Sequence, residues 1–161
     1  MQNNVNSELL RQIIEYGCNF QSKKDVIQFL IDNNINPAIS NFDKLVEKIL
    51  QRFMIGKYAK RRAQLLLDYN EIRTLRNCYL KQKQAYDYAF ENNVKAESII
   101  KKSFDLLEKY IKQLVQKYLD KYNFKIKEYY IESNGNISVL TLCDSFADGF
   151  KTITGSYRPQ I

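Results

Sequence analysis

The chain has 161 residues and a mass of 19.1 kDa, which is the size of one domain. Hydrophobic residues make up 45% of the sequence, so the chain can form a packed core and is not a disordered tail. Its 25 basic and 18 acidic side chains give a formal charge of +7, and histidine is absent, which excludes the Ser-His and Cys-His nucleophile pairs and the commonest zinc ligand.

Two short helices are expected at the start of the chain. Ser7 is a good N-cap residue with an acidic residue in the next turn, and Gly17 ends that helix. Ser22 begins the second helix in the same way, and the Asn33-Asn34 pair ends it. Apolar residues at spacings of three and four give each helix one face that can be buried.

A third short helix has two possible starts, the Asn36-Pro37 pair or Ser40, and continues to Gly56. Residues 1–56 are therefore expected to be a short-helix module, which can form a helix-turn-helix. The polar residues that could reach bases from it are Asn33, Asn34, Asn36, Ser40 and Asn41. The first forty residues carry a net charge of −1, however, so an ordinary helical bundle is the alternative.

Two long helices are expected in residues 57–123. The first covers 57–91, which contains neither Gly nor Pro, and the second follows a break at Asn92-Asn93. Apolar stripes follow Leu65, Tyr69, Ile72, Leu75, Tyr79, Tyr86 and Phe90 in the first helix and Ile100, Phe104, Leu107, Ile111, Leu114 and Tyr118 in the second. Because the connection is short, we expect the two helices to pack antiparallel as a basic hairpin.

The period of the apolar residues changes from about 3.6 to 2 after residue 123. Alternation over residues 124–143 predicts strands, the Asn-Gly pair at 134–135 is typical of a hairpin turn, and the Asp-Gly pair at 148–149 is a second turn candidate. Residues 124–161 are therefore expected to be a β-hairpin or three-stranded meander with a tail. The predicted fold class is mainly α with a small C-terminal antiparallel β unit (α+β), built as one compact domain.

The three cysteines, Cys18, Cys78 and Cys143, are about sixty residues apart, a spacing that fits neither a disulfide framework nor a metal site. We expect three reduced, mostly buried thiols in the cytoplasm, or in a nuclear or organellar matrix. No segment approaches 18 consecutive apolar residues, and the N-terminus lacks a basic and apolar leader. Neither a membrane span nor secretion is expected.

Positive charge is concentrated in the middle of the chain, where residues 41–122 carry 18 basic and 10 acidic side chains. Four cations follow Gly56 within six residues, and a bound polyanion would relieve their conflict with the helix dipole. The predicted nucleic-acid-binding residues are Lys57, Lys60, Arg61, Arg62, Arg73, Arg76, Lys81 and Lys83. The alternative is a solvated helix surface, because 18 Lys against 7 Arg is typical of A/T-rich codon usage.

Catalytic chemistry is not expected. Asp144 and Asp148 could hold Mg²⁺, but turns use the same residues, and Cys143 and Ser145 lack a neighbouring base. Tyrosines near the cations could stack on bases, but Tyr79, Tyr86 and Tyr118 fall on the apolar stripes, and most of the tyrosines are expected to pack. We predict no enzyme activity, no cofactor and no metal.

Two classes of function remain open. The first is a non-catalytic nucleic-acid-binding accessory protein, which contacts the backbone of DNA or RNA through the basic central helices, within a larger assembly or as a homo-oligomer. The alternative is a protein–protein interaction or structural subunit with no nucleic-acid role, such as a viral, mobile-element or organellar component or an inhibitor of another protein. Salt dependence distinguishes the two, because affinity for a polyanion falls steeply as ionic strength rises.

Overall fold

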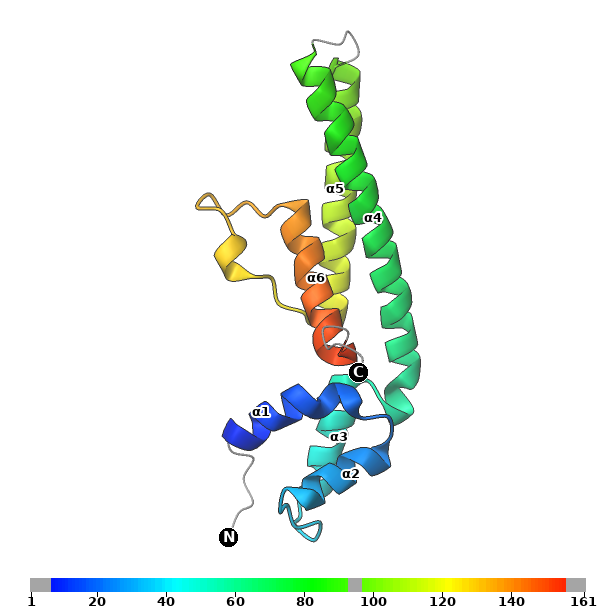
Figure 1. Ribbon diagram of the computed structural model, residues 1–161, viewed down its shortest axis with the longest axis vertical. Helices are drawn as coiled ribbons and strands as arrows, with labels where there is room; N and C mark the ends of the chain where they lie inside the picture. The colour runs from blue at the N-terminus through cyan, green and yellow to red at the C-terminus, as the bar shows by residue number, and fades with distance from the viewer. Residues whose placement is uncertain (1–6, 93–96, 156–161) are drawn as a thin grey trace. The chain divides into compact units, whose positions relative to one another are not determined.

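The computed structural model describes residues 7–92 and 97–155. In chain order the helices are α1 (Ser7–Tyr16), η1 (Gly17–Asn19), α2 (Lys23–Asp32), α3 (Phe42–Phe53), η2 (Gly56–Tyr58), α4 (Ala59–Glu91), α5 (Glu97–Tyr122), η3 (Glu128–Tyr130) and α6 (Val139–Thr154), as Figure 1 shows. By packing, the chain divides into two compact units. Unit 1 comprises residues 1–66 and 150–161, and unit 2 comprises residues 67–149.

Unit 1 is built around α1, α2 and α3. Phe20 and Phe53 are fully buried at its centre. The ring of Phe20 meets those of Phe29 and Phe53 edge-on, at centroid distances of 5.4 and 6.0 Å. The remaining buried members of this core are Leu9, Ile13, Val26, Leu30, Ile35, Phe42, Val46, Ile49, Leu50 and Ile55.

The first two predicted helices of unit 1 are confirmed. Ser22 caps α2, since its hydroxyl accepts a hydrogen bond from the backbone N–H of Asp25 at 3.4 Å. Gly17 follows the last residue of α1, and its lack of a side chain leaves room for the ring of Phe53. The start of α2 is therefore set by its cap, and the end of α1 by the close packing at Gly17, both where the sequence predicts.

The third helix begins at Phe42, so the alternative start at Ser40 is closer than the one at residues 36–37. Met54 ends this helix in the left-handed conformation, with φ 52°. Residues 33–41 connect α2 to α3 and are longer than the three or four residues typical of a helix-turn-helix turn.

The two long helices are confirmed, and α4 and α5 pack antiparallel within unit 2 (Figure 1). Three hydrogen bonds from a tyrosine hydroxyl to a carboxylate link the two helices: Tyr122 to Asp68 at 2.6 Å, Tyr118 to Glu71 at 3.3 Å, and Tyr79 to Glu108 at 3.2 Å. The start of one helix therefore lies beside the end of the other. Asp68 is buried, and Lys121 also contacts its carboxylate at 3.0 Å. α4 ends at Glu91, next to the predicted break, which lies partly outside the described residues.

The predicted C-terminal β unit is wrong. Residues 139–154 form α6, and the described part of 124–155 contains no strand. Buried apolar residues recur along α6 at helical spacings, at Val139, Leu142, Cys143, Phe146, Phe150 and Ile153. Ser138 precedes this helix, and its hydroxyl accepts a hydrogen bond from the N–H of Thr141 at 3.1 Å, as an N-cap does.

The chain turns at residues 132–136, but this turn joins no strands, and of the Asn-Gly pair only Gly135 has a positive φ, so the predicted hairpin turn is wrong. Gly135 donates its N–H to the carbonyl of Glu132 at 2.8 Å and has a φ of 81°, which favours glycine. Glu132 in turn donates its N–H to the carbonyl of Asn136 at 3.1 Å. The turn therefore closes a loop between η3 and α6.

Gly149, predicted as a turn residue, lies inside α6. A side chain at this position would overlap the ring of Phe124, which packs on the helix there. Phe124 also contacts the rings of Tyr122 and Phe146, at centroid distances of 5.7 and 5.2 Å. The absence of a side chain at Gly149 therefore allows α6 to pack closely against the segment after α5.

The thiols differ in exposure. Cys143 is buried on α6, as expected, whereas Cys78 is exposed on α4, and the side chain of Cys18 lies outside the described residues. Among the described helices, none is long and apolar enough to span a membrane.

Candidate nucleic-acid interface

The eight predicted cations fall in both units. Unit 1 contains Lys57, Lys60, Arg61 and Arg62. Unit 2 contains Arg73, Arg76, Lys81 and Lys83. The sequence of unit 1 carries twelve basic and six acidic side chains, whereas that of unit 2 carries thirteen and twelve. The excess charge therefore belongs to unit 1, and unit 2 is close to neutral.

Three cations form a row along the exposed face of α3, which we call the α3 row. Lys44, Lys48 and Arg52 are spaced four residues apart, so they follow one another at intervals of about 6 Å on one side of the helix. All three side chains are exposed, whereas Val46 and Leu50 on the opposite side of the helix are buried. Among the described residues, none of the three cations forms an ion pair.

Glu47 of α3 links this helix to η2, beside the α3 row. Its carboxylate accepts a hydrogen bond from the hydroxyl of Tyr58 at 3.0 Å and lies 3.0 Å from Lys57 Nζ. The hydrogen bonds that Lys57 and Tyr58 donate hold the pKa of the Glu47 carboxyl below its usual value. Because Lys57 already neutralises Glu47, this carboxylate offsets little of the charge on the α3 row.

The first turn of α4 carries Lys60, Arg61 and Arg62 and no acidic residue. Lys60 and Arg61 are exposed, and Arg62 is half-buried. Cations are unfavourable at a helix N-terminus, where the dipole and the unpaired N–H groups favour an anion. This turn gives unit 1 a second group of cations that a bound anion would stabilise.

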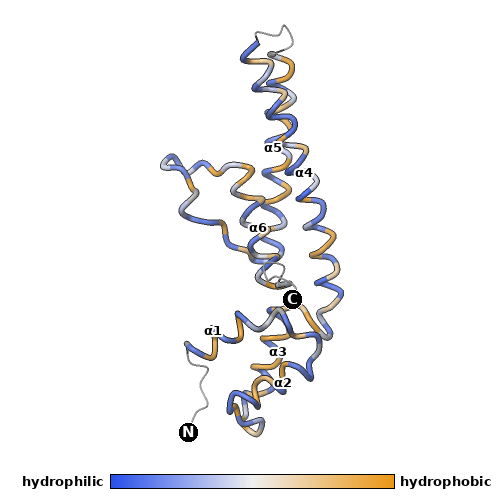
Figure 2. The backbone as a smooth tube through the Cα atoms, viewed as in Figure 1, coloured by the Kyte–Doolittle hydropathy of each residue, from blue (hydrophilic) through white to orange (hydrophobic). Residues whose placement is uncertain are grey.

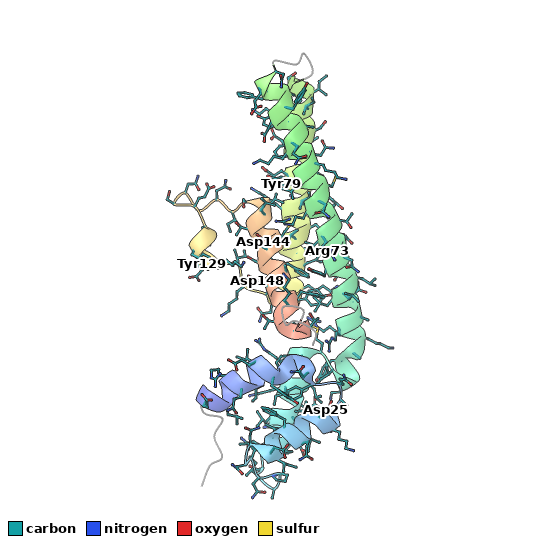
Figure 3. The ribbon with its side chains drawn as sticks, in the orientation of Figure 1. Asp25, Arg73, Tyr79, Tyr129, Asp144 and Asp148 are labelled. Atoms are coloured by element: carbon teal, nitrogen blue, oxygen red, sulfur yellow. The ribbon has the colours of Figure 1, made fainter. Side chains whose placement is uncertain are left out.

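The four predicted cations of unit 2 have different surroundings. Arg76 is half-buried, and its Nε lies 3.5 Å from the carboxylate of Asp144 on α6. This Nε has no hydrogen-bond partner among the described residues. Asp144 and Arg73 are labelled in Figure 3. The Arg73 guanidinium lies 5.7 Å from the ring centroid of Tyr69. Lys81 and Lys83 are exposed but point about 200° apart around the helix axis. Helix geometry therefore does not bring these four into one patch.

Tyr79 and Tyr86 of α4 pack against α5, as expected, with their ring centroids 5.2 and 5.4 Å from the ring centroid of Phe104. Burial raises the pKa of Tyr79 to about 12, and Glu108 accepts a hydrogen bond from its hydroxyl. Tyr129 is 76% exposed on η3 (Figure 3), so it stands on a 3-10 turn and not on the predicted strand.

The carboxylates of α6 are paired with cations. Asp144 lies beside Arg76, and Asp148 lies 2.5 Å from Lys127 Nζ. The Ser145 hydroxyl is buried and accepts a hydrogen bond from the N–H of Lys127 at 3.1 Å. In the described part of the chain, no three His, Cys, Asp or Glu side chains form a group that could hold a metal ion.

Burial makes the Cys143 thiol unreactive. It is 2% exposed, and burial raises its pKa to about 12 from an ordinary value of 9.0. In a Cys18→Ser, Cys78→Ser variant at pH 8, we expect an aromatic disulfide reagent to modify Cys143 at least about a hundredfold more slowly in the native protein than in urea. Equal rates would contradict this burial.

The same raised pKa predicts how stability depends on pH. Because the folded state keeps the Cys143 proton more tightly than the unfolded state does, the stabilisation is complete below pH 9 and is lost as the pH rises toward 12. Urea unfolding at several alkaline pH values measures this loss, and a Cys143→Ala variant should lose less stability over the same range.

The α3 row was not among the residues predicted from the sequence. Its signal was the spacing of Lys44, Lys48 and Arg52 on a predicted helix, opposite the apolar positions. A count of charge over residues 41–122 hid this pattern, because it added the three cations of α3 to the more numerous cations of the long helices.

Comparison of the chain with protein-family models, with curated proteins and with solved structures finds no match.

Proposed function

We propose that unit 1 binds the backbone of a nucleic acid without catalysis. The observation that carries this proposal is the α3 row, whose three exposed cations are not neutralised by an acidic neighbour among the described residues. The cations in the first turn of α4 add to the positive charge of the same unit. Each phosphate that such a side chain neutralises releases counterions, which favours binding at low salt.

The recognition we propose is largely independent of nucleotide sequence. Lysine and arginine contacts to phosphate position a protein on a nucleic acid but do not read bases. Two of the four asparagines that could have read bases make local hydrogen bonds: the Asn36 side chain accepts one from the N–H of Ala38 at 2.9 Å, and the Asn33 amide donates one to the carbonyl of Phe29 at 2.8 Å. The expected ligand is therefore a general DNA or RNA backbone.

The test neutralises the α3 row in the full chain. We expect the Lys44→Gln, Lys48→Gln, Arg52→Gln variant to bind a 30-nucleotide DNA or RNA at least about tenfold more weakly than the wild type at 50 mM salt. The slope of log affinity against log salt should fall by about 3, because each lost phosphate contact removes about one unit. Fluorescence anisotropy with labelled duplex and single strands measures both.

The control variant removes the same number of positive charges from unit 2. Lys81→Gln, Lys83→Gln, Lys125→Gln removes three exposed cations of unit 2 and should change affinity less than threefold. A third variant, with glutamine at Lys60, Arg61 and Arg62, measures the contribution of the first turn of α4. No measurable wild-type binding at 50 mM salt, or equal losses in the α3 and control variants, would overturn the proposal.

A further inference from the structure

The long-helix hairpin of unit 2 carries large apolar side chains that no described residue covers. In Figure 1 the far ends of α4 and α5 extend past α6, and Figure 2 shows that hydrophobic residues continue into this part. On α5, Ile99, Leu106 and Tyr110 are 68%, 70% and 55% exposed. Exposed apolar groups of this size mark surfaces that associate with another molecule.

These three side chains lie on one side of α5. Spacings of seven and four residues place them within about 40° of one another around the helix axis. The opposite side of α5 is buried through Phe104, Ile111 and Val115. We call the exposed line of Ile99, Leu106 and Tyr110 the α5 stripe, and one further helix could pack along it.

The α5 stripe leads toward a groove. Helical spacing continues its line to Gln113 and Lys117, and both residues also line a groove of about 640 Å³ between α5 and the loop before α6. Ile137 and Leu142 form apolar parts of the groove wall. A helix laid on the stripe and its groove would therefore run along the 19 residues from Ile99 to Lys117, a rise of about 27 Å.

The charge along this surface indicates which helix fits. Lys102 and Lys109 lie beside the stripe, and Lys112 and Lys117 line the groove together with one acidic residue, Asp120, so cations outnumber acids on this surface. A second copy of this chain would bring the same excess of lysines to this surface, so charge favours a different partner. We propose that the α5 stripe and its groove dock an acidic amphipathic helix of another protein.

This inference does not depend on nucleic-acid binding. The stripe belongs to unit 2, whereas the α3 row belongs to unit 1, and the two surfaces share no residue. A chain that fails to bind nucleic acid could still dock the helix, and the reverse also holds.

The test uses a synthetic peptide of 21 residues with leucine at spacings of three and four and glutamate at the flanking positions. A second peptide carries lysine in place of every glutamate. Fluorescence anisotropy with the full chain should show the acidic peptide binding at least tenfold more tightly than the basic one. Leu106→Asp should weaken acidic-peptide binding at least tenfold.

The control is Leu67→Asp, which makes the same change of charge and polarity at another exposed leucine of unit 2 and should alter binding less than twofold. Circular dichroism melts of both variants confirm that the fold is retained. A second variant, Lys102→Glu, Lys109→Glu, should reverse the preference between the peptides.

Three results would overturn this proposal. The first is equal weakening by the two leucine variants, which would show that only net charge matters. The second is a dimer in sedimentation that Leu106→Asp dissociates, which would make the occupant a second copy. The third is Leu106-dependent binding to anionic lipid vesicles without binding to the acidic peptide.

Discussion

Replacing Phe146 with alanine is expected to lower the free energy of unfolding of unit 2 by about 3–5 kcal/mol. The Phe146 ring is fully buried and lies 6.3, 5.9 and 5.2 Å from the ring centroids of Tyr118, Tyr122 and Phe124. These contacts join α6 to α5 and to the segment that follows α5. Urea unfolding, followed by circular dichroism at 222 nm, measures the loss.

The matched control is Phe90→Ala, because it removes the same ring from an exposed position of the same unit. Its expected effect is below about 1 kcal/mol, since little apolar surface returns to water. If the two variants lost similar amounts of stability, Phe146 would not be part of the core of unit 2.

Most of the helical architecture could be predicted from local signals. Ser22 caps α2 through its own side chain, and the absence of Gly and Pro over residues 57–91 allows one uninterrupted helix. The antiparallel pairing of α4 and α5 follows from their short connection. The predicted stripe was less accurate at its end, where Phe90 is exposed and Ala89 is buried in its place.

The C-terminal region was mispredicted because two patterns overlap there. Residues 137–143 alternate like a strand, but Val139 and Phe146 belong to a longer helical series that continues to Ile153. The Asp-Gly pair at 148–149 predicts a turn, and only the contact with Phe124 explains a glycine at that point. Such a contact between segments distant in sequence has no local signal.

Which cations are free of acidic neighbours could not be predicted from the sequence. Composition cannot show that Lys57 is paired with Glu47, or that Arg76 is half-buried beside Asp144, because these pairs depend on tertiary packing. Whether a cation is available to a phosphate is decided by such neighbours. The α3 row could have been found from its spacing alone.

Gly17→Ala is expected to destabilise unit 1 by about 1–3 kcal/mol, because a methyl group at this position would overlap the fully buried ring of Phe53. Gly17 has no positive φ, so the cost arises from packing and not from backbone strain.

A double-mutant cycle with Phe53→Leu tests this cause. Leucine alone leaves a void and costs about 1 kcal/mol or more, but it also gives the new methyl group space. The double variant should therefore be more stable than the sum of the two single losses predicts, by at least about 1 kcal/mol in urea unfolding. Additive losses would mean that Gly17 and Phe53 do not share the same space, and the close contact between the end of α1 and the end of α3 would not exist in solution.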